Sequence, residues 1–464
     1  MEHLLALVLA AGEGKRMKSK NSKVTHRICG RALIGWVSEA ARNAGIDDCV
    51  YIVGHRSDQV MECLGKAQKY VLQEQQLGTG HAVMQARDHL TGKNGYAVVL
   101  YGDMPLIRPE TISELIEAHR KGGNSATVIT AEMEDPTGYG RIVRNAAGDV
   151  VKNVEERDAS AVEKAIREIN TGIYCFTIKD LLDSLKELKN ENSQGEYYLT
   201  DTLEILVKKG LKVGTIKVAD SDEIRGINDR VQLYEASEAL RKRILEGYMR
   251  SGVTIIDPGS TYIDHGVEIG IDTVIYPGTM IEEGTVIGED CRIGPGSRIA
   301  GSTVGSGVEI MNSVVLESTI GDNTRVGPFA YVRPNTRIGR NVRVGDFVEI
   351  KNSVIGDRSK VSHLTYVGDS DVGGNVNFGC GVVTVNYNGK KKYRTVIGDD
   401  AFIGCNVNLI APVEVGRNAY VAAGSTITDD VPEDSLAIAR QRQANKEGWV
   451  TRKGMGRSTD SDKK

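Results

Sequence analysis

The chain has 464 residues, which is enough for two or three domains with sizeable hydrophobic cores. Its formal net charge of −4 argues against a general basic field, and so against nucleic acid as a partner. Its seven cysteines form no C-x-x-C pair, which favours reduced thiols in the cytoplasm over a disulfide or zinc framework.

The first apolar run, Leu4 to Ala11, predicts a buried parallel strand. It lacks a basic leader and is too short to span a bilayer, so we expect neither a signal peptide nor a membrane anchor. The next six residues, GEGKRM, place two glycines and two cations, Lys15 and Arg16, directly after the strand. Such a loop is suited to phosphate binding. A glycine pair alone is a weak signal, and a tight turn is the simpler interpretation.

A second buried strand is predicted within Tyr96–Ile107, where the apolar run ends at Gly102 and Asp103. A carboxylate at the C-terminal end of a parallel strand lies where open α/β sheets bind their ligands. Asp103 could equally cap the following segment. The strand alone leaves both interpretations open.

Several motifs of the first half resemble those of known enzymes. The string LAAGEGKRM with the later Lys23 is similar to the signature of sugar-phosphate nucleotidyltransferases, although Lys15 and Ser22 replace the usual Thr and Pro. The strings PTGYGRI, VEERDA, EINTGIY, GEYYLTD and GIND follow in order. Together they resemble the bifunctional bacterial enzymes that acetylate glucosamine-1-phosphate and uridylylate the product. The resemblance implies an α/β, Rossmann-like nucleotidyltransferase domain over residues 1–229.

The same resemblance implies three sets of residues for uridylyl transfer. UTP would contact Leu9, Ala10, Ala11, Gly12, Gly14, Lys23, Gln73, Gln76, Gly78, Thr79, Tyr101 and Gly102. N-acetylglucosamine-1-phosphate would contact Gly140, Glu155, Asn170 and Asn228. Asp103 and Asn228 would ligate Mg²⁺, with Arg16 and Lys23 as catalytic cations. Cations suit this reaction because two anions must be brought together, whereas the phosphate nucleophile is already charged and needs no base.

A linker and a repeat follow. Residues 230–250 have the composition of a helix and predict a linker between domains. From Val253 to Ile427 an aliphatic residue followed by Gly returns at multiples of about six, which fits a solenoid of short flat faces. The repeat resembles the hexapeptide-repeat, left-handed parallel β-helix, and this resemblance, rather than the period, implies the handedness. We assign residues 251–464 to this domain, including a polar C-terminal tail.

The departures from the repeat carry the predicted acetyl-transfer site. Residues 386–395 predict a protruding loop, and loops on rigid scaffolds commonly carry function. The strings YVRP, GDFVEIKNS and DRSKVSHLTYVGD resemble the acetyltransferase half of the same bifunctional enzymes. The resemblance makes His363 the general base and Glu349 the residue that orients it. An attacking amine must lose a proton, and an imidazole can accept one near neutral pH, whereas a lone histidine would otherwise be interpreted as a surface residue.

Two further sets of residues follow from the resemblance. Glucosamine-1-phosphate would contact Arg333, Lys351, Tyr366, Asn377 and Lys392. Acetyl-CoA would contact Cys380, Asn386, Tyr387, Cys405, Ala423 and Arg440, with Cys380 and Cys405 in place of the usual Ala and Ser. The resemblance also implies a homotrimer, in which Lys446 and Trp449 of the tail cover a neighbouring subunit's CoA site. The last ten residues are predicted to be disordered.

These observations favour a two-site enzyme of UDP-N-acetylglucosamine synthesis, with acetyl transfer first and uridylyl transfer second. The alternative is a single-activity NDP-sugar pyrophosphorylase whose β-helix serves assembly or regulation. A non-enzymatic structural solenoid would leave Arg16, Lys23 and Asp103 unexplained. We expect small-molecule substrates, Mg²⁺ at the uridylyl site, a cytoplasmic location, and no nucleic-acid or membrane partner.

Overall fold

The computed structural model describes residues 2–456, so the predicted disorder of the last ten residues lies largely outside the described residues. The chain divides into two compact units. The first comprises Met1–Gly247 with Ile263–His265, and the second comprises Tyr248–Tyr262 with Gly266–Lys464. Within residues 2–456, no helix combines the length and the apolar character that a membrane crossing requires.

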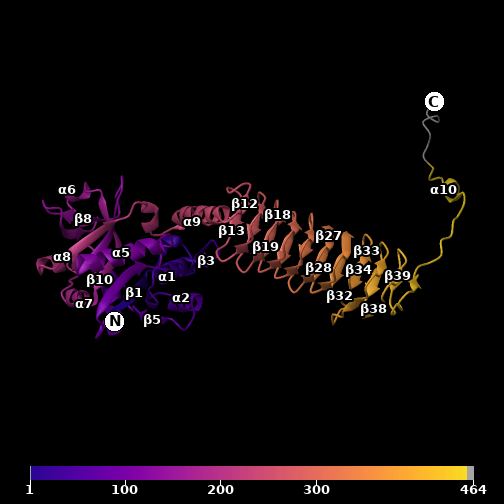
Figure 1. The fold of residues 1–464 in the computed structure, drawn as a ribbon, viewed down its shortest axis with the longest axis horizontal. Coiled ribbons are helices and arrows are strands. Elements are labelled where there is room, and N and C mark those ends of the chain that lie inside the picture. Colours follow the sequence, from indigo (N-terminus) through magenta and orange to yellow (C-terminus); the bar gives the residue numbers. More distant parts are fainter. Residues whose placement is uncertain (1, 457–464) are drawn as a thin grey trace, which may run out of the picture. The chain divides into compact units, whose positions relative to one another are not determined.

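A mixed sheet organises the first unit (Figure 1). Its order is β11 (Val213–Lys217), β7 (Ala126–Glu132), β10 (Glu168–Thr177), β6 (Gly95–Tyr101), β1 (His3–Ala10), β4 (Asp48–Val53) and β5 (Lys69–Leu72). Off this path, β8 (Gly140–Arg144) pairs with β10 and β9 (Val150–Val154) pairs with β8, while β2 (Arg27–Ile28) and β3 (Arg31–Ala32) form a separate pair. As predicted for the first apolar run, β1 is a buried strand that pairs in parallel with β4 and β6.

Two hydrophobic cores form because successive side chains of a strand point to opposite faces of the sheet. Ala6, Val8 and Ala10 of β1 belong to one core, and Leu5, Leu7 and Leu9 belong to the other. The first core is covered by α1 (Leu33–Asn43), α2 (Ser57–Leu64) and α5 (Pro109–Gly122). The second is covered by α3 (Thr79–Gln85), α4 (Arg87–Leu90), α7 (Ile178–Leu185) and α8 (Asp201–Lys208). A short α6 (Ala161–Lys164) begins at a capping box formed by Ser160 and Glu163.

The long helix α9 (Arg230–Arg250) contributes to a third cluster. Its Ala236 and Leu240 are buried against Met17, Leu33 and Leu106. The part of α9 up to Gly247 therefore belongs to the first unit, against which it packs through a few buried side chains.

A buried histidine makes the first unit sensitive to acid. His119 of α5 is fully buried, with Nδ1 3.0 Å from Thr127 Oγ1 and Nε2 3.2 Å from Thr177 Oγ1. Burial lowers the pKa of His119 to about 4. As the pH falls below about 6.5, this histidine binds a proton in the unfolded chain but not in the folded chain. The free energy of unfolding is therefore unaffected by His119 above pH 6.5 and decreases as the pH falls toward 4.

We expect His119→Gln to reduce this acid sensitivity. The wild type should lose on the order of 3 kcal/mol more than the variant between pH 7 and pH 4. Unfolding in urea, followed by the fluorescence of Trp36, measures the difference at each pH. The exposed His55, changed to Gln, is the control. Equal acid losses in wild type and His119→Gln would contradict this assignment.

The second unit is a left-handed parallel β-helix, as predicted. Almost every strand pairs in parallel with the strand three further along the chain, which builds three sheets of eleven, ten and nine strands (Figure 1). The eleven-stranded sheet contains β12 (Thr254–Ile255), β15 (Val274–Ile275), β18 (Arg292–Ile293), β21 (Glu309–Ile310), β24 (Arg325–Val326), β27 (Arg343–Asp346), β30 (Lys360–His363), β33 (Asn377–Phe378), β36 (Phe402–Ile403), β39 (Tyr420–Val421) and β41 (Leu436–Ala437).

The other two sheets complete each coil. The ten-stranded sheet contains β13 (Tyr262–Ile263), β16 (Met280–Ile281), β19 (Arg298–Ala300), β22 (Val314–Leu316), β25 (Tyr331–Val332), β28 (Glu349–Lys351), β31 (Tyr366–Gly368), β34 (Val383–Val385), β37 (Asn408–Ile410) and β40 (Thr426–Ile427). The nine-stranded sheet contains β14 (Glu268–Ile269), β17 (Val286–Ile287), β20 (Thr303–Val304), β23 (Thr319–Ile320), β26 (Arg337–Ile338), β29 (Val354–Ile355), β32 (Ser370–Val372), β35 (Thr395–Ile397) and β38 (Val413–Val415). The tail holds α10 (Trp449–Arg452).

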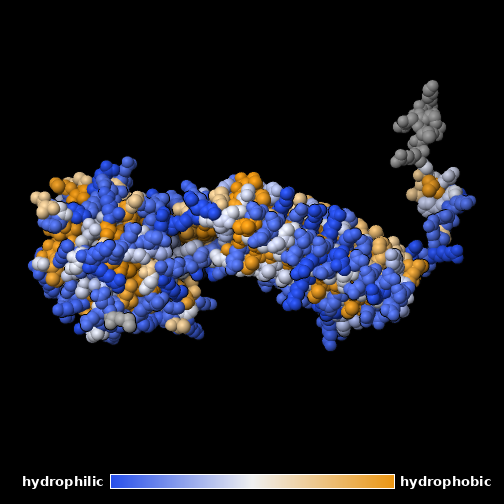
Figure 2. Space-filling view, in the orientation of Figure 1, coloured by the Kyte–Doolittle hydropathy of each residue, from blue (hydrophilic) through white to orange (hydrophobic). Residues whose placement is uncertain are grey.

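The six-residue repeat is explained by the interior of the solenoid. Aliphatic residues that precede a glycine, such as Ile293, Val326 and Val344, are buried. The glycine permits close stacking of coils, since a Cβ at Gly345 would lie 1.9 Å from the carbonyl oxygen of Ser362. Outward positions are mostly polar, and the visible face of the solenoid is largely hydrophilic with separate hydrophobic patches (Figure 2).

Candidate active sites

The predicted nucleotide residues surround a cavity of about 280 Å³ at the end of β1 and β6. Ten of them line it: Leu9, Ala10, Ala11, Gly12, Lys23, Gln73, Gln76, Gly78, Thr79 and Tyr101. The other two predicted residues adjoin the lining, because Gly102 N–H donates to the Leu9 carbonyl at 2.9 Å and Gly14 abuts Lys23. Gly14 has φ +64°, and a Cβ there would lie 2.7 Å from Lys23 Cβ, so glycine lets the loop approach Lys23.

Lys23 connects residues that are far apart in sequence. It begins the short 3₁₀ helix Lys23–Thr25, and its Nζ donates to Asp103 Oδ2 and, at 3.4 Å, to Asn228 Oδ1. The backbone strengthens this arrangement, because Ile227 N–H donates to the Asp103 carbonyl at 3.0 Å. Arg16 lies on the 3₁₀ helix Lys15–Met17 with an exposed side chain.

The oxygens of Asp103 and Asn228 fit the chemistry of Mg²⁺. Both contact one cationic nitrogen, so they converge on a common point where positive charge is accommodated. Carboxylate and amide oxygens are ligands that Mg²⁺ accepts, and the ion commonly takes only one or two of them from protein and the rest from water and phosphate. Within residues 2–456, no cluster of three or more His, Cys, Asp and Glu side chains provides a larger ligand set.

Three of the four predicted sugar residues of the first unit lie on or next to strands β8 to β10: Gly140 begins β8, Glu155 follows β9 and Asn170 is on β10, whereas Asn228 lies beside Lys23. Glu155 accepts hydrogen bonds from Asn153 Nδ2 at 2.9 Å and Thr200 Oγ1 at 3.2 Å, and burial raises the pKa of its carboxyl. Gly140 lies beside it, since a Cβ at that position would meet Asn153 at 2.6 Å and Glu155 at 3.1 Å. Asn170 is buried and donates to the hydroxyl of Tyr174 at 2.6 Å.

In the second unit, His363 ends β30 at a corner of the solenoid. Its Nδ1 lies 2.7 Å from Oδ1 of Asp346, which is its register partner one coil earlier. This hydrogen bond is the main cause of the lowered pKa of Asp346. The expectation that Glu349 orients His363 is wrong, because Asp346 makes the contact and the Glu349 carboxylate accepts from Arg333 Nη1 at 2.8 Å. With Nδ1–H donated to Asp346, Nε2 is the nitrogen available to accept a proton.

A second group lies along β28 and β31. Three cationic side chains predicted to bind the sugar phosphate line one cavity: Arg333, Lys351 and Lys392. The ammonium of Lys351 lies close enough to Lys392 to lower the pKa of Lys392. Tyr366 is the register partner of Glu349 on the same sheet. Two adjacent ammonium groups and a guanidinium are suited to a phosphate dianion.

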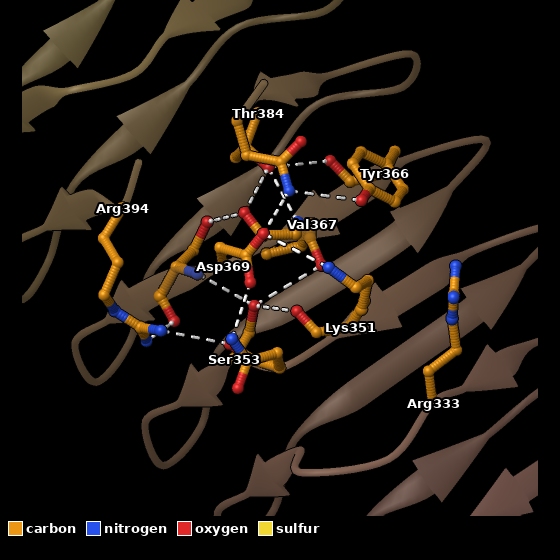
Figure 3. Close-up of polar contacts among 12 residues, drawn as sticks. Arg333, Lys351, Ser353, Tyr366, Val367, Asp369, Thr384 and Arg394 are labelled. Carbon is orange, nitrogen blue, oxygen red and sulfur yellow. Dashed lines mark hydrogen bonds and ion pairs between the residues drawn. The ribbon is translucent and has the colours of Figure 1, made fainter. Parts of the chain in front are cut away.

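Asp369 is a central residue of this cavity that the sequence prediction missed. Its side chain is almost fully buried and accepts from Lys351 Nζ at 3.3 Å, Asn352 Nδ2 at 2.6 Å, and Asn386 Nδ2. Burial raises the pKa of this carboxyl, but the three hydrogen bonds and the charge of Lys351 outweigh burial and hold it below its usual value. Figure 3 shows Asp369 reaching toward Lys351 at the centre of these contacts. One carboxylate thus fixes a predicted phosphate ligand and a predicted CoA ligand.

We expect Asp369→Asn to reduce kcat/KM for acetyl transfer by at least about tenfold, since hydrogen bonds to charged groups contribute roughly 1.5–3 kcal/mol each. An amide in this place turns an NH₂ group toward at least one of three donors. The KM for glucosamine-1-phosphate should rise because Lys351 loses its partner. Asp322→Asn, at a partly exposed carboxylate on another coil, is the control. An unchanged KM and kcat in Asp369→Asn would assign Asp369 a purely structural role.

The remaining predicted residues lie in other places. Asn377 is on β33, beside Lys360 of the preceding coil. The loop residue Tyr387 is exposed, and its hydroxyl donates to the Gly389 carbonyl at 2.7 Å. The corner position that His363 occupies is taken on the next three coils by Cys380, Cys405 and Ala423. Arg440 lies near Gly424, since a Cβ added to this glycine would be 3.7 Å from Cδ of Arg440. These residues do not line the cavity around Lys351.

Comparisons with known proteins agree with this two-part architecture. Residues 6–199 match the MobA-like NTP transferase domain, and residues 266–301, 317–352 and 394–429 match the bacterial transferase hexapeptide repeats. The chain is 65% identical over 455 residues to the bifunctional protein GlmU of Acetivibrio thermocellus, covering 98% of this chain and 99% of that protein. The chain belongs to the GlmU family.

Other GlmU proteins are similar over the same span. Bifunctional protein GlmU of Caldanaerobacter subterraneus subsp. tengcongensis is 56% identical over 450 residues, which cover 97% of this chain and 98% of that GlmU. Bifunctional protein GlmU of Clostridium botulinum is 55% identical over 451 residues, with the same coverage. Both units of this chain therefore have counterparts in GlmU.

Proposed function

We propose that this chain synthesises UDP-N-acetylglucosamine in two steps: acetyl transfer from acetyl-CoA to glucosamine-1-phosphate, then uridylyl transfer from UTP to the product with release of pyrophosphate. The observation that carries the proposal is the presence of two separate constellations in one GlmU-family chain. One is the cavity around Lys23, Asp103 and Asn228. The other is His363 on Asp346 together with the cations around Lys351. A single-activity pyrophosphorylase would have no use for the second constellation.

In the acetyl-transfer step, Arg333, Lys351 and Lys392 bind the phosphate of glucosamine-1-phosphate. The amine attacks the thioester carbonyl, and His363 Nε2 takes the proton that the amine loses. Asp346 keeps the imidazole in the tautomer with a free Nε2 and stabilises the imidazolium that forms. The exposed side chain of His363 is accessible to both substrates.

In the uridylyl-transfer step, the loop after β1 and the cations Arg16 and Lys23 bind the triphosphate. The sugar phosphate, held near Glu155 and Asn170, attacks the α-phosphorus in line with the departing pyrophosphate. Asp103 and Asn228 would hold Mg²⁺, which when bound offsets charge on the phosphates. Positioning and charge neutralisation are the whole contribution of these side chains, because no proton needs to be removed from the nucleophile.

The test is a single assay on the purified protein with glucosamine-1-phosphate, acetyl-CoA, UTP and Mg²⁺, omitting one component at a time. Free CoA should require only the amine sugar and acetyl-CoA. Pyrophosphate should require all four components, or UTP, Mg²⁺ and N-acetylglucosamine-1-phosphate. Pyrophosphate from added N-acetylglucosamine-1-phosphate without any CoA release would instead support the single-activity alternative.

The domain division is also part of the proposal: residues 1–229 carry uridylyl transfer, 230–250 connect, and 251–464 carry acetyl transfer. We expect a fragment of residues 1–247 to keep uridylyl transfer from N-acetylglucosamine-1-phosphate. A fragment of residues 1–229 should be less stable by at least about 2 kcal/mol, because it loses the buried Leu240 and Ala236. Urea unfolding and pyrophosphate release compare the two fragments. Equal stability would show that α9 contributes nothing to the first unit.

We further propose a cytoplasmic homotrimer. The support for assembly is an exposed apolar column on successive coils, Met311, Phe329, Phe347 and Leu364, in which the rings of Phe329 and Phe347 stack 5.5 Å apart. Such a continuous apolar stripe is typical of a buried contact between subunits. The cytoplasmic location is supported by the seven unpaired cysteines. Sedimentation equilibrium measures the subunit number, and a monomer at micromolar concentration would contradict the trimer.

A further inference from the structure

We propose that Cys380 and Cys405 form a reversible thiol–disulfide switch at the acetyl-transfer site. The two residues occupy the same corner position in successive coils. Phe378 pairs with Ile403 in register, and two residues further along this register Cys380 lies opposite Cys405. The backbone agrees with this alignment, because Asn406 N–H donates to the Cys380 carbonyl at 2.7 Å.

The spacing of the coils suits a disulfide. Neighbouring parallel strands lie about 4.8 Å apart, and disulfides bridge Cα atoms separated by about 4.4–6.8 Å. Side chains of this corner do meet across one coil, since Asp346 and His363, two coils below, approach to 2.7 Å. Both thiols are unpaired, Cys405 is exposed, and Cys380 is partly exposed. A reagent in solution can therefore reach Cys405 first, with Cys380 in position to resolve the product.

The position of the pair explains why a disulfide would affect acetyl transfer. His363 lies one coil before Cys380, and Gly381 N–H donates to the His363 carbonyl at 3.3 Å. Ala423 lies one coil after Cys405, where Gly424 N–H donates to the Cys405 carbonyl at 2.8 Å. A bond between the sulfurs fixes the two side chains against each other and removes both free thiols from positions predicted to contact acetyl-CoA. This consequence rests on the proposed acetyl transfer, whereas formation of the disulfide does not.

The chemistry requires a small-molecule disulfide as oxidant, for example CoA disulfide or glutathione disulfide. The Cys405 thiolate attacks one sulfur of the reagent, whose S–S bond breaks and releases one thiol. The Cys380 thiolate then attacks the Cys405 sulfur of the mixed disulfide and releases the second thiol. The protein loses two electrons and two protons, and the reagent is reduced to two thiols. Excess dithiothreitol reverses both steps.

The experiment incubates the full-length protein with glutathione disulfide and divides the sample. Mass spectrometry without reduction should show a cross-linked pair of peptides that contain Cys380 and Cys405. CoA release should fall by about tenfold or more relative to the reduced protein, while pyrophosphate release from N-acetylglucosamine-1-phosphate should change by less than about twofold. Dithiothreitol should remove the cross-link and restore CoA release together.

Each variant is compared with its own reduced form. Cys405→Ser should show no cross-link and should keep most of its own CoA release after oxidation. Cys380→Ala should show no cross-link and should instead accumulate a glutathione adduct on Cys405, because the resolving thiol is missing. Cys63→Ser, at an exposed cysteine of the first unit, should be inhibited like the wild type. The switch is overturned if no cross-link forms, if only glutathione adducts form, or if the cross-linked protein still releases CoA at the reduced rate. A reduced protein without any CoA release would refute the proposed acetyl transfer instead, and the cross-link would still be judged by mass.

Discussion

His363→Asn should reduce CoA release by about 10²- to 10⁴-fold, which is the usual loss when a positioned general base is removed. The amide of asparagine cannot accept the amine's proton, although it can still donate a hydrogen bond to Asp346. Because the side chain is exposed, little folding penalty is expected. CoA release, measured with saturating acetyl-CoA across a range of glucosamine-1-phosphate concentrations, separates kcat from KM. The loss should appear in kcat.

Two controls accompany this variant. Asp346→Asn should reduce CoA release less severely, because the base remains and only its orientation and charge partner are lost. Pyrophosphate release from N-acetylglucosamine-1-phosphate should be unchanged, because Lys23, Asp103 and Asn228 belong to the first unit. If His363→Asn released CoA within about threefold of the wild-type rate, well short of the general-base range, His363 would be a surface histidine after all.

Asp103→Ala should reduce Mg²⁺-dependent pyrophosphate release by about 10²-fold or more while CoA release stays near wild type. The substitution removes one of two oxygens that converge beside Lys23, and a metal that clamps developing charge contributes several kcal/mol to the barrier. Initial rates over a titration of Mg²⁺ measure the effect. The Mg²⁺ concentration for half-maximal rate should rise together with the fall in rate.

The Mg²⁺ titration distinguishes two effects of the substitution. Loss of a Mg²⁺ ligand raises the Mg²⁺ concentration needed for half-maximal rate, whereas loss of the ion-pair partner of Lys23 lowers the rate without that rise. Asp103→Asn keeps the shape and one neutral oxygen, so it should retain more activity than Asp103→Ala. Asp88→Ala, at an exposed carboxylate of α4, is the control for a loss of charge elsewhere in the first unit. Pyrophosphate release from Asp103→Ala at the wild-type rate would remove Asp103 from the site.

Much of the fold follows from local patterns. The continuous apolar run of β1 predicts a strand that is buried on both faces and pairs in parallel, as the structure shows. The aliphatic–glycine repeat specifies stacked coils because each coil repeats the same contact. The site of the first unit could not be derived in this way. Lys23 lies 80 residues from Asp103 and 205 from Asn228, so only resemblance to known enzymes could group them before the chain was folded.

The two missed carboxylates show a different limit. Asp346 precedes His363 by 17 residues, close to one coil, whereas Glu349 lies three residues nearer in sequence and falls out of step with His363. A search for a carboxylate one whole coil before His363 would have identified Asp346 as its hydrogen-bond partner. Asp369 had no such signal, because it occupies a left-handed turn position, φ +49°, that asparagine and aspartate commonly fill without any function. Its importance depends on three donors from two coils, because Lys351 and Asn352 lie on one coil and Asn386 on another.

The coil-by-coil pairing of the solenoid has a consequence for how such chains can change length. Each rung pairs only with the rungs on either side, so the strands ahead of Val314 do not pair with the strands that carry the residues proposed for acetyl transfer. Duplication or loss of one whole coil there would restore every strand to an equivalent partner, whereas an insertion of two or three residues would turn the inward aliphatic side chains out of the interior. The number of coils in this region can therefore change by whole coils during evolution without altering the corner of the solenoid that carries His363.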